Sequence, residues 1–155
     1  MKPSINIPEA LHRGESQLPF VEFIPGMDIQ VPHVNIDSGL WVIRIQFAPG
    51  IMLPKHLHTG EVFAFTLSGS WKYLEYEAVN TAGSYLYEPA GSVHTLHVPE
   101  TNKEVTDVWF AIQGANLNLD ADGKVESVWD ATFVLNTYLA LCEAAGHPKP
   151  DVIGA

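Results

Sequence analysis

The chain has 155 residues, of which 46% are hydrophobic and only 17% charged, with 11 prolines and 12 glycines. This length predicts one domain with a core of its own, and the apolar content excludes a disordered chain. The formal charge of −10, with only 8 Lys and Arg, argues against nucleic acid as a partner. One cysteine, Cys142, cannot form an internal disulfide, and no stretch reads as a signal peptide or membrane span. We therefore expect a soluble, cytoplasmic protein that binds neither nucleic acid nor membrane.

Short apolar or alternating segments between Gly and Pro turns predict an all-β fold over residues 20–129. An N-terminal arm, residues 1–19, precedes them, because its prolines prevent a long helix. The segments expected as strands are Val21–Ile24, Met27–Val31, Leu40–Phe47, Val62–Leu67, Ser70–Tyr76, Tyr85–Glu88, Val93–Val98 and Val105–Ile112, with a hairpin over Gly114–Trp129.

One helix is predicted, over residues 130–146. Asp130 can cap its start, apolar residues recur at helical spacing, and Gly146 can end it before Pro148. Residues 147–155 then form a tail. The whole chain, residues 1–155, is expected to be a single domain.

Three histidines are candidate metal ligands. His56 and His58 are two positions apart on a strand, so both imidazoles project to one face. His94 lies in a second segment framed by Gly and Pro. Three imidazoles can bind one ion and leave open positions for catalysis, but imidazole alone does not select among iron, zinc, manganese and nickel. The alternative is that the three histidines are hydrogen-bonded within a barrel that binds no metal.

The framing of these histidines resembles the two sequence motifs of the cupins. In the first motif, five residues separate Gly50 from the pair His56-x-His58, and Gly69 follows. In the second motif, five residues separate Gly83 from Pro89-x-Gly91, and two more precede His94. The resemblance implies a cupin, a double-stranded β-helix or jelly-roll barrel, here with the N-terminal arm and the C-terminal helix. The glutamate of the first cupin motif is replaced by Val62, so a three-histidine site is implied. Glu61 is one residue before that glutamate position, so its side chain is expected on the other face of the strand.

The sequence around the motifs is similar to that of the 2,4'-dihydroxyacetophenone dioxygenase family. The similar segments include Gly69-Ser-Trp71-Lys-Tyr73 and Tyr87-Glu88-Pro89-Ala-Gly91. This resemblance implies a mononuclear non-haem iron(II) dioxygenase that cleaves a carbon–carbon bond of an aromatic α-hydroxyketone with O2. Two alternatives remain: a zinc- or manganese-dependent isomerase or lyase acting on a hydroxyketone or sugar, and a ligand-sensing metal-binding cupin.

Other residues are candidates for substrate contact or catalysis. Glu61 is the candidate base, although strand parity turns it away from the histidine face. Arg44 and Gln46 either face solvent or bind an anionic substrate in the pocket. The aromatic residues Trp71, Tyr73 and Trp109 either fill the core or line an aromatic substrate site. Because cupins commonly pair through barrel edges, we expect a homo-oligomer, a dimer or higher.

Overall fold

The protein was analysed as a computed structural model, which describes residues 8–155; the first seven residues of the expected arm lie outside the described part. Short strands dominate, as predicted, and one α-helix follows them. The elements are η1 (Glu15–Gln17), β1 (Val21–Ile24), β2 (Met27–Asn35), β3 (Leu40–Phe47), β4 (His56–His58), β5 (Val62–Ser68), β6 (Ser70–Tyr73), β7 (Asn80–Thr81), β8 (Tyr85–Glu88), β9 (Val93–His94), β10 (Leu96–His97), β11 (Thr106–Gln113), β12 (Asn116–Leu119), β13 (Val125–Trp129) and α1 (Ala131–Ala144).

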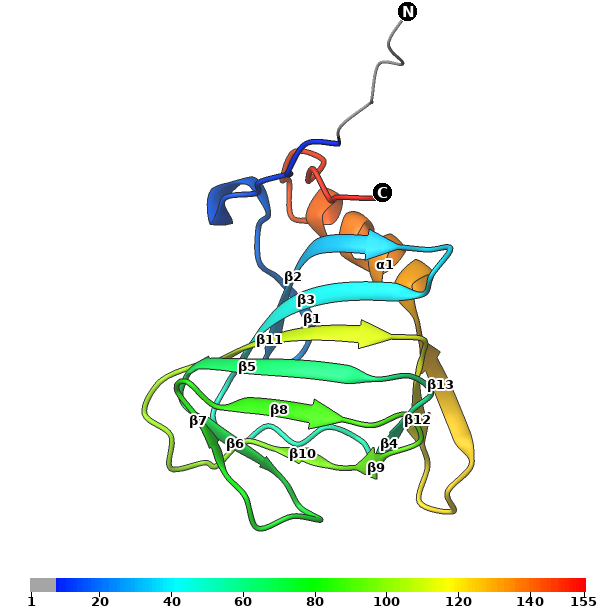
Figure 1. Ribbon diagram of the computed structural model, residues 1–155. Coiled ribbons are helices and arrows are strands. Elements are labelled where there is room, and N and C mark those ends of the chain that lie inside the picture. Colours follow the sequence, from blue (N-terminus) through cyan, green and yellow to red (C-terminus); the bar gives the residue numbers. More distant parts are fainter. Residues whose placement is uncertain (1–7) are drawn as a thin grey trace, which may run out of the picture.

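The strands form an antiparallel barrel (Figure 1). One wall is a six-stranded sheet in the order β1-β2-β3-β11-β5-β8, and the opposite wall contains the sheets β13-β12-β4-β9 and β10-β6-β7. Strands distant in sequence are neighbours: β11 lies between β3 and β5, and β4 lies between β12 and β9. This order is the jelly-roll arrangement that the sequence predicts, and it brings the histidine-bearing strands β4 and β9 together.

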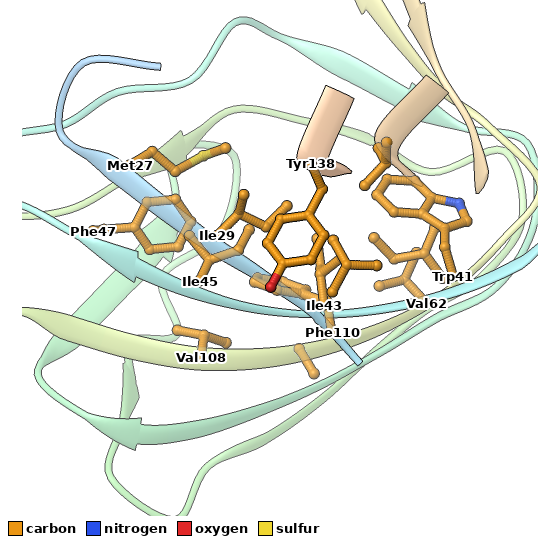
Figure 2. Close-up of a cluster of buried hydrophobic side chains, with 14 of the residues drawn as sticks. Met27, Ile29, Trp41, Ile43, Ile45, Phe47, Val62, Val108, Phe110 and Tyr138 are labelled. Atoms are coloured by element: carbon orange, nitrogen blue, oxygen red, sulfur yellow. The ribbon is translucent and has the colours of Figure 1, made fainter. Parts of the chain in front are cut away.

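The barrel core is built by strict alternation along β3 and by the buried residues of β11. Trp41, Ile43, Ile45 and Phe47 are buried, while the residues between them are half-buried on the opposite face. Figure 2 shows these side chains meeting Met27, Ile29, Val108 and Phe110 inside the barrel. Burying each large aliphatic or aromatic side chain stabilises the fold by roughly 1.5–3 kcal/mol. One face of the six-stranded sheet therefore forms most of the core.

The helix α1 packs on β1 and β2 (Figure 1). The Asp130 carboxylate accepts a hydrogen bond from the Phe133 amide at 2.8 Å, which confirms the predicted N-cap. The Tyr138 hydroxyl donates to the Pro19 carbonyl at 2.7 Å, fixing the helix to the chain segment ahead of β1. Val134 reaches the barrel interior, so α1 closes the barrel as well as covering it. Within residues 8–155, no helix is long and apolar enough to cross a membrane.

Three predicted strands differ clearly from the observed ones, and the expected strand Ser70–Tyr76 already ends at Tyr73 as β6. β2 continues past Pro32 to Asn35, because its pairing with β3 shifts register between Gln30 and His33 and the bulge accommodates the proline. The expected strand Val93–Val98 is split in two at Thr95. There the Thr95 amide and hydroxyl both donate to the Glu75 carboxylate, at 2.8 Å each, which interrupts the ladder.

Candidate metal centre

The three histidines meet inside the barrel. His56 on β4 is directly opposite His94 on β9 in the antiparallel ladder, and His58 is two residues further along the same face. All three side chains are buried, and one ligand nitrogen from each lies within 4.8 Å of the others. The pairing of β4 with β9 therefore brings together the three histidines that the sequence predicts as metal ligands.

Gly91 explains why the second motif needs its glycine. Its φ is 84°, a left-handed conformation that residues with a side chain rarely adopt. In this conformation its amide donates to the His58 carbonyl at 2.8 Å, and the His58 amide donates to the Ser92 carbonyl at 3.1 Å. The turn after Pro89 is thereby attached to the histidine strand and places His94 beside it.

His56 and His58 are held in the form that binds a metal. Burial lowers the pKa of His56, and it lowers the pKa of His58 to about 4. Both rings are therefore neutral at physiological pH. Nδ1 of His56 lies 2.9 Å from the Pro54 carbonyl oxygen. Because a carbonyl only accepts, Nδ1 carries the proton and Nε2 presents its lone pair.

Glu88 is a fourth side chain at this site, and sequence reasoning did not assign it. It is 3% exposed, and its Oε2 lies 3.0 Å from Nε2 of His94 and 3.2 Å from Nε2 of His58. Its other oxygen accepts a hydrogen bond from the Tyr73 hydroxyl. Burial acts to raise the pKa of Glu88, but its contacts with His94, His58 and Tyr73 outweigh it, so the pKa falls.

The residues fit a divalent cation. Oε2 of Glu88 and Nε2 of His94 lie 3.0 Å apart, but within residues 8–155 neither atom has a hydrogen-bond partner of good geometry. Buried polar atoms without partners are costly, and a shared ion would satisfy both at once. Glu88 also places a carboxylate beside the three predicted histidines.

Two of the three histidines, His56 and His58, line a small apolar cavity of about 50 Å³. His56, His58, Tyr73 and Asn116 supply the polar part of its lining together with the indoles of Trp41 and Trp129. The Tyr73 hydroxyl is already hydrogen-bonded to Glu88, but Oδ1 of Asn116 is buried and has no hydrogen-bond partner in the described part of the chain. The apolar lining consists of Phe23, Met27, Ile29, Ile43, Ile45, Phe47, Leu53, Leu96, Phe110, Ile112 and Val134.

Three of the suggested substrate contacts lie on the other side of the sheet. Arg44 and Gln46 are at the outward positions of β3, because the inward positions are taken by the core residues. Arg44 forms a two-point ion pair with Asp107, at 2.9 and 2.8 Å, and Gln46 donates to the same carboxylate at 3.1 Å. Trp109 is half-buried beside Arg44. The suggestion that these residues bind substrate is therefore corrected: they stabilise the outer face.

The remaining candidates are placed as follows. Tyr73 lines the cavity and stacks on His94, with ring centroids 3.7 Å apart. Trp71 is fully buried in the core, and its indole donates to the Thr66 hydroxyl at 2.9 Å. Glu61 is exposed and accepts from the Tyr87 hydroxyl at 2.7 Å. Its carboxylate thus points away from the histidines, as strand parity predicts, and the suggested role as base is corrected.

Glu88 could have been found from a weaker signal in the sequence, whereas Asn116 could not. On β8, Tyr85 and Tyr87 alternate with Leu86 and Glu88, so Glu88 is on the inward face of a strand that leads into the second motif. Asn116 is paired with His58 across β12 and β4. That pairing joins distant segments and is not visible in the sequence.

The barrel topology and the histidine cluster define this protein as a cupin. Residues 10–115 match the family model described as the ChrR cupin-like domain, so the chain belongs to that family. No curated protein matched the sequence.

Solved structures agree with this fold. A cupin-like protein of unknown function from Ralstonia eutropha JMP134 is 35% identical, with a TM-score of 0.89, over 97% of this chain and 96% of that one. An RmlC-like cupin from the same organism is 25% identical, with a TM-score of 0.84, over 92% and 93%. An acetylacetone dioxygenase from Acinetobacter johnsonii is 19% identical, with a TM-score of 0.73, over 91% and 97%. At that identity, the last likeness shows the fold alone.

Proposed function

We propose that this protein is a mononuclear non-haem iron dioxygenase that cleaves a carbon–carbon bond of a compact α-hydroxyketone, or a related diketone, with O2. The observation that carries the proposal is the convergence of His56, His58 and His94, buried and partly facing an apolar cavity. Three protein ligands leave positions free for substrate and O2. Bound iron(II) would supply Lewis-acid and redox chemistry. The sequence resemblance to the dihydroxyacetophenone dioxygenases and the acetylacetone dioxygenase fold support the same class.

The chain's own residues prepare the site for this chemistry. Glu88 offsets part of the ion's charge, and its contacts with His58 and His94 keep both rings oriented. The Tyr73 hydroxyl holds the Glu88 carboxylate, while the Tyr73 ring supports His94 from one side. The apolar lining limits water near the reacting carbons.

The cavity also indicates the kind of substrate. Its volume of about 50 Å³ favours a compact aliphatic ketone over an aryl ketone. A sugar would bury several hydroxyl groups among apolar side chains without partners, at a cost of roughly 1–3 kcal/mol each. We infer that the Asn116 amide, which has a free buried oxygen, bonds the substrate hydroxyl. These features favour the oxygenase over a sugar isomerase.

The proposed reaction conserves all atoms. The bond between the carbonyl carbon and the carbinol carbon breaks, and each carbon gains one oxygen atom of O2. A hydroxyketone thus gives a carboxylic acid and formic acid. The two carbons together lose four electrons, and these reduce O2.

Oxygen uptake by iron(II)-loaded protein tests this proposal. We expect uptake with hydroxyacetone or acetylacetone and slower uptake with 2,4'-dihydroxyacetophenone. The His94→Ala variant should show none. Tight zinc or manganese binding, with no uptake by the iron form on any of these ketones, would instead favour an isomerase, a lyase or a ligand sensor.

A further inference from the structure

The outer surface of β5 and β8 carries a cluster of exposed apolar side chains, here called the aromatic face. It consists of Phe63, Phe65, Leu67, Tyr85 and Tyr87, which are 37%, 53%, 47%, 54% and 45% exposed. Such residues are normally buried or scattered on a protein surface. Figure 1 shows β5 and β8 side by side, on the side of the barrel away from α1.

The aromatic face is an ordered ladder. Phe63 is opposite Tyr87 and Phe65 is opposite Tyr85 across the antiparallel pair. The rings of these pairs contact each other, with centroids 5.6 and 5.1 Å apart. β8 is also the last strand of its sheet. A preformed ladder at a sheet edge can dock a partner with little loss of side-chain entropy.

We propose that the aromatic face is the surface through which two copies of this chain form a symmetric dimer. None of its five residues is charged, although each copy carries a formal charge of −10. A cationic partner would be recognised by carboxylates, but the carboxylate of Glu61, which lies beside this face, accepts a hydrogen bond from Tyr87. An uncharged face allows two equally acidic copies to approach with the least repulsion. A two-fold axis places the aromatic face of one copy against the same face of the other copy.

The exposed area is sufficient for such a contact. Aromatic side chains bury roughly 150–250 Å² each when fully covered. At the observed exposures, the five side chains offer on the order of 400 Å² per copy, or about 800 Å² in a dimer, and a polar rim can extend this past the roughly 1,000 Å² of a specific interface. The aromatic face would then form the apolar centre of the interface. This inference does not depend on the metal or on the proposed reaction.

Sedimentation equilibrium of the full chain tests the dimer. We expect wild type to have twice the mass of the 17.0 kDa chain at micromolar concentration. Phe65→Asp and Tyr85→Asp should each weaken association at least tenfold, because they place charge in the apolar centre. Val125→Asp is the matched control: Val125 is 53% exposed on β13, outside the aromatic face, and its change should leave the dimer intact.

Circular dichroism establishes that each variant is folded. Should an aspartate variant unfold, Phe65→Ser combined with Tyr85→Ser provides a milder version of the same test. A monomeric wild type at tens of micromolar, or a dimer that persists in the folded aromatic-face variants, would overturn the proposal.

Discussion

Oε2 of Glu88 lies 3.0 Å from Nε2 of His94, and among residues 8–155 neither atom has a hydrogen-bond partner of good geometry. The two residues come from consecutive strands, β8 and β9, joined by the turn at Gly91. A carboxylate at this distance orients the ring and adds negative charge beside the ion. The second motif thus delivers a carboxylate as well as a histidine.

Replacing Glu88 should weaken metal binding. We expect Glu88→Gln to lower iron or zinc affinity by roughly 10–100-fold, because the amide keeps the shape but loses the charge. Competition against a chromogenic chelator measures this. Glu61→Gln is the matched control, since Glu61 is an exposed carboxylate near the same strands. Equal losses in both variants would count against a role for Glu88 at the site.

Removing the metal should lower the melting temperature. If the free ion is about 1,000-fold above its dissociation constant, binding to the folded state alone adds about 4 kcal/mol. For a chain of this size each kcal/mol corresponds to roughly 2–4 °C, so a chelator should lower the melting temperature by on the order of 10 °C. The His94→Ala variant should melt at one temperature with or without chelator. A wild-type protein indifferent to chelator would show that the cluster binds no metal.

Asn116 should determine ketone affinity. We expect Asn116→Ala to weaken hydroxyacetone binding about tenfold, through the loss of one hydrogen bond inside the cavity. Quenching of fluorescence from Trp41 and Trp129, which line the cavity, can follow binding to zinc-loaded protein without turnover. Asn118→Ala is the control on the same strand, because the Asn118 amide is engaged with Ser127 at 3.0 Å. An Asn116 variant that binds as tightly as wild type would remove this residue from the substrate site.

Arg44 should affect stability and not ketone binding. Arg44→Met leaves the 7% exposed Asp107 without its ion-pair partner, and we expect a loss of about 3 kcal/mol in the free energy of unfolding. Arg13→Met is the control: its partner Asp151 has a side chain 69% exposed, so we expect a change of less than about 1 kcal/mol. Urea denaturation gives both values. A large loss of ketone affinity in stable Arg44→Met protein would return Arg44 to the substrate site.

The sequence allows much of this architecture to be predicted, because the relevant signals are local. Alternation along Leu40–Phe47 defines β3, and the Gly and Pro frames around His56 and His94 define the metal strands. Asn116 at the site required the pairing of β12 with β4, which joins segments distant in the sequence. Likewise, the sequence could not decide whether Arg44 faces solvent or the pocket. Alternation groups the residues of a strand by face but does not show which face is inside.

The most direct test of the central claim is the fate of oxygen atoms in a single turnover of iron(II)-loaded protein with hydroxyacetone or acetylacetone under ¹⁸O2. With hydroxyacetone, cleavage should give acetic and formic acid, each carrying one labelled oxygen atom, with one O2 consumed per ketone. Mass spectrometry of both products reads this out. Products formed without label, or a ketone that is isomerised with no O2 consumed, would contradict the dioxygenase account.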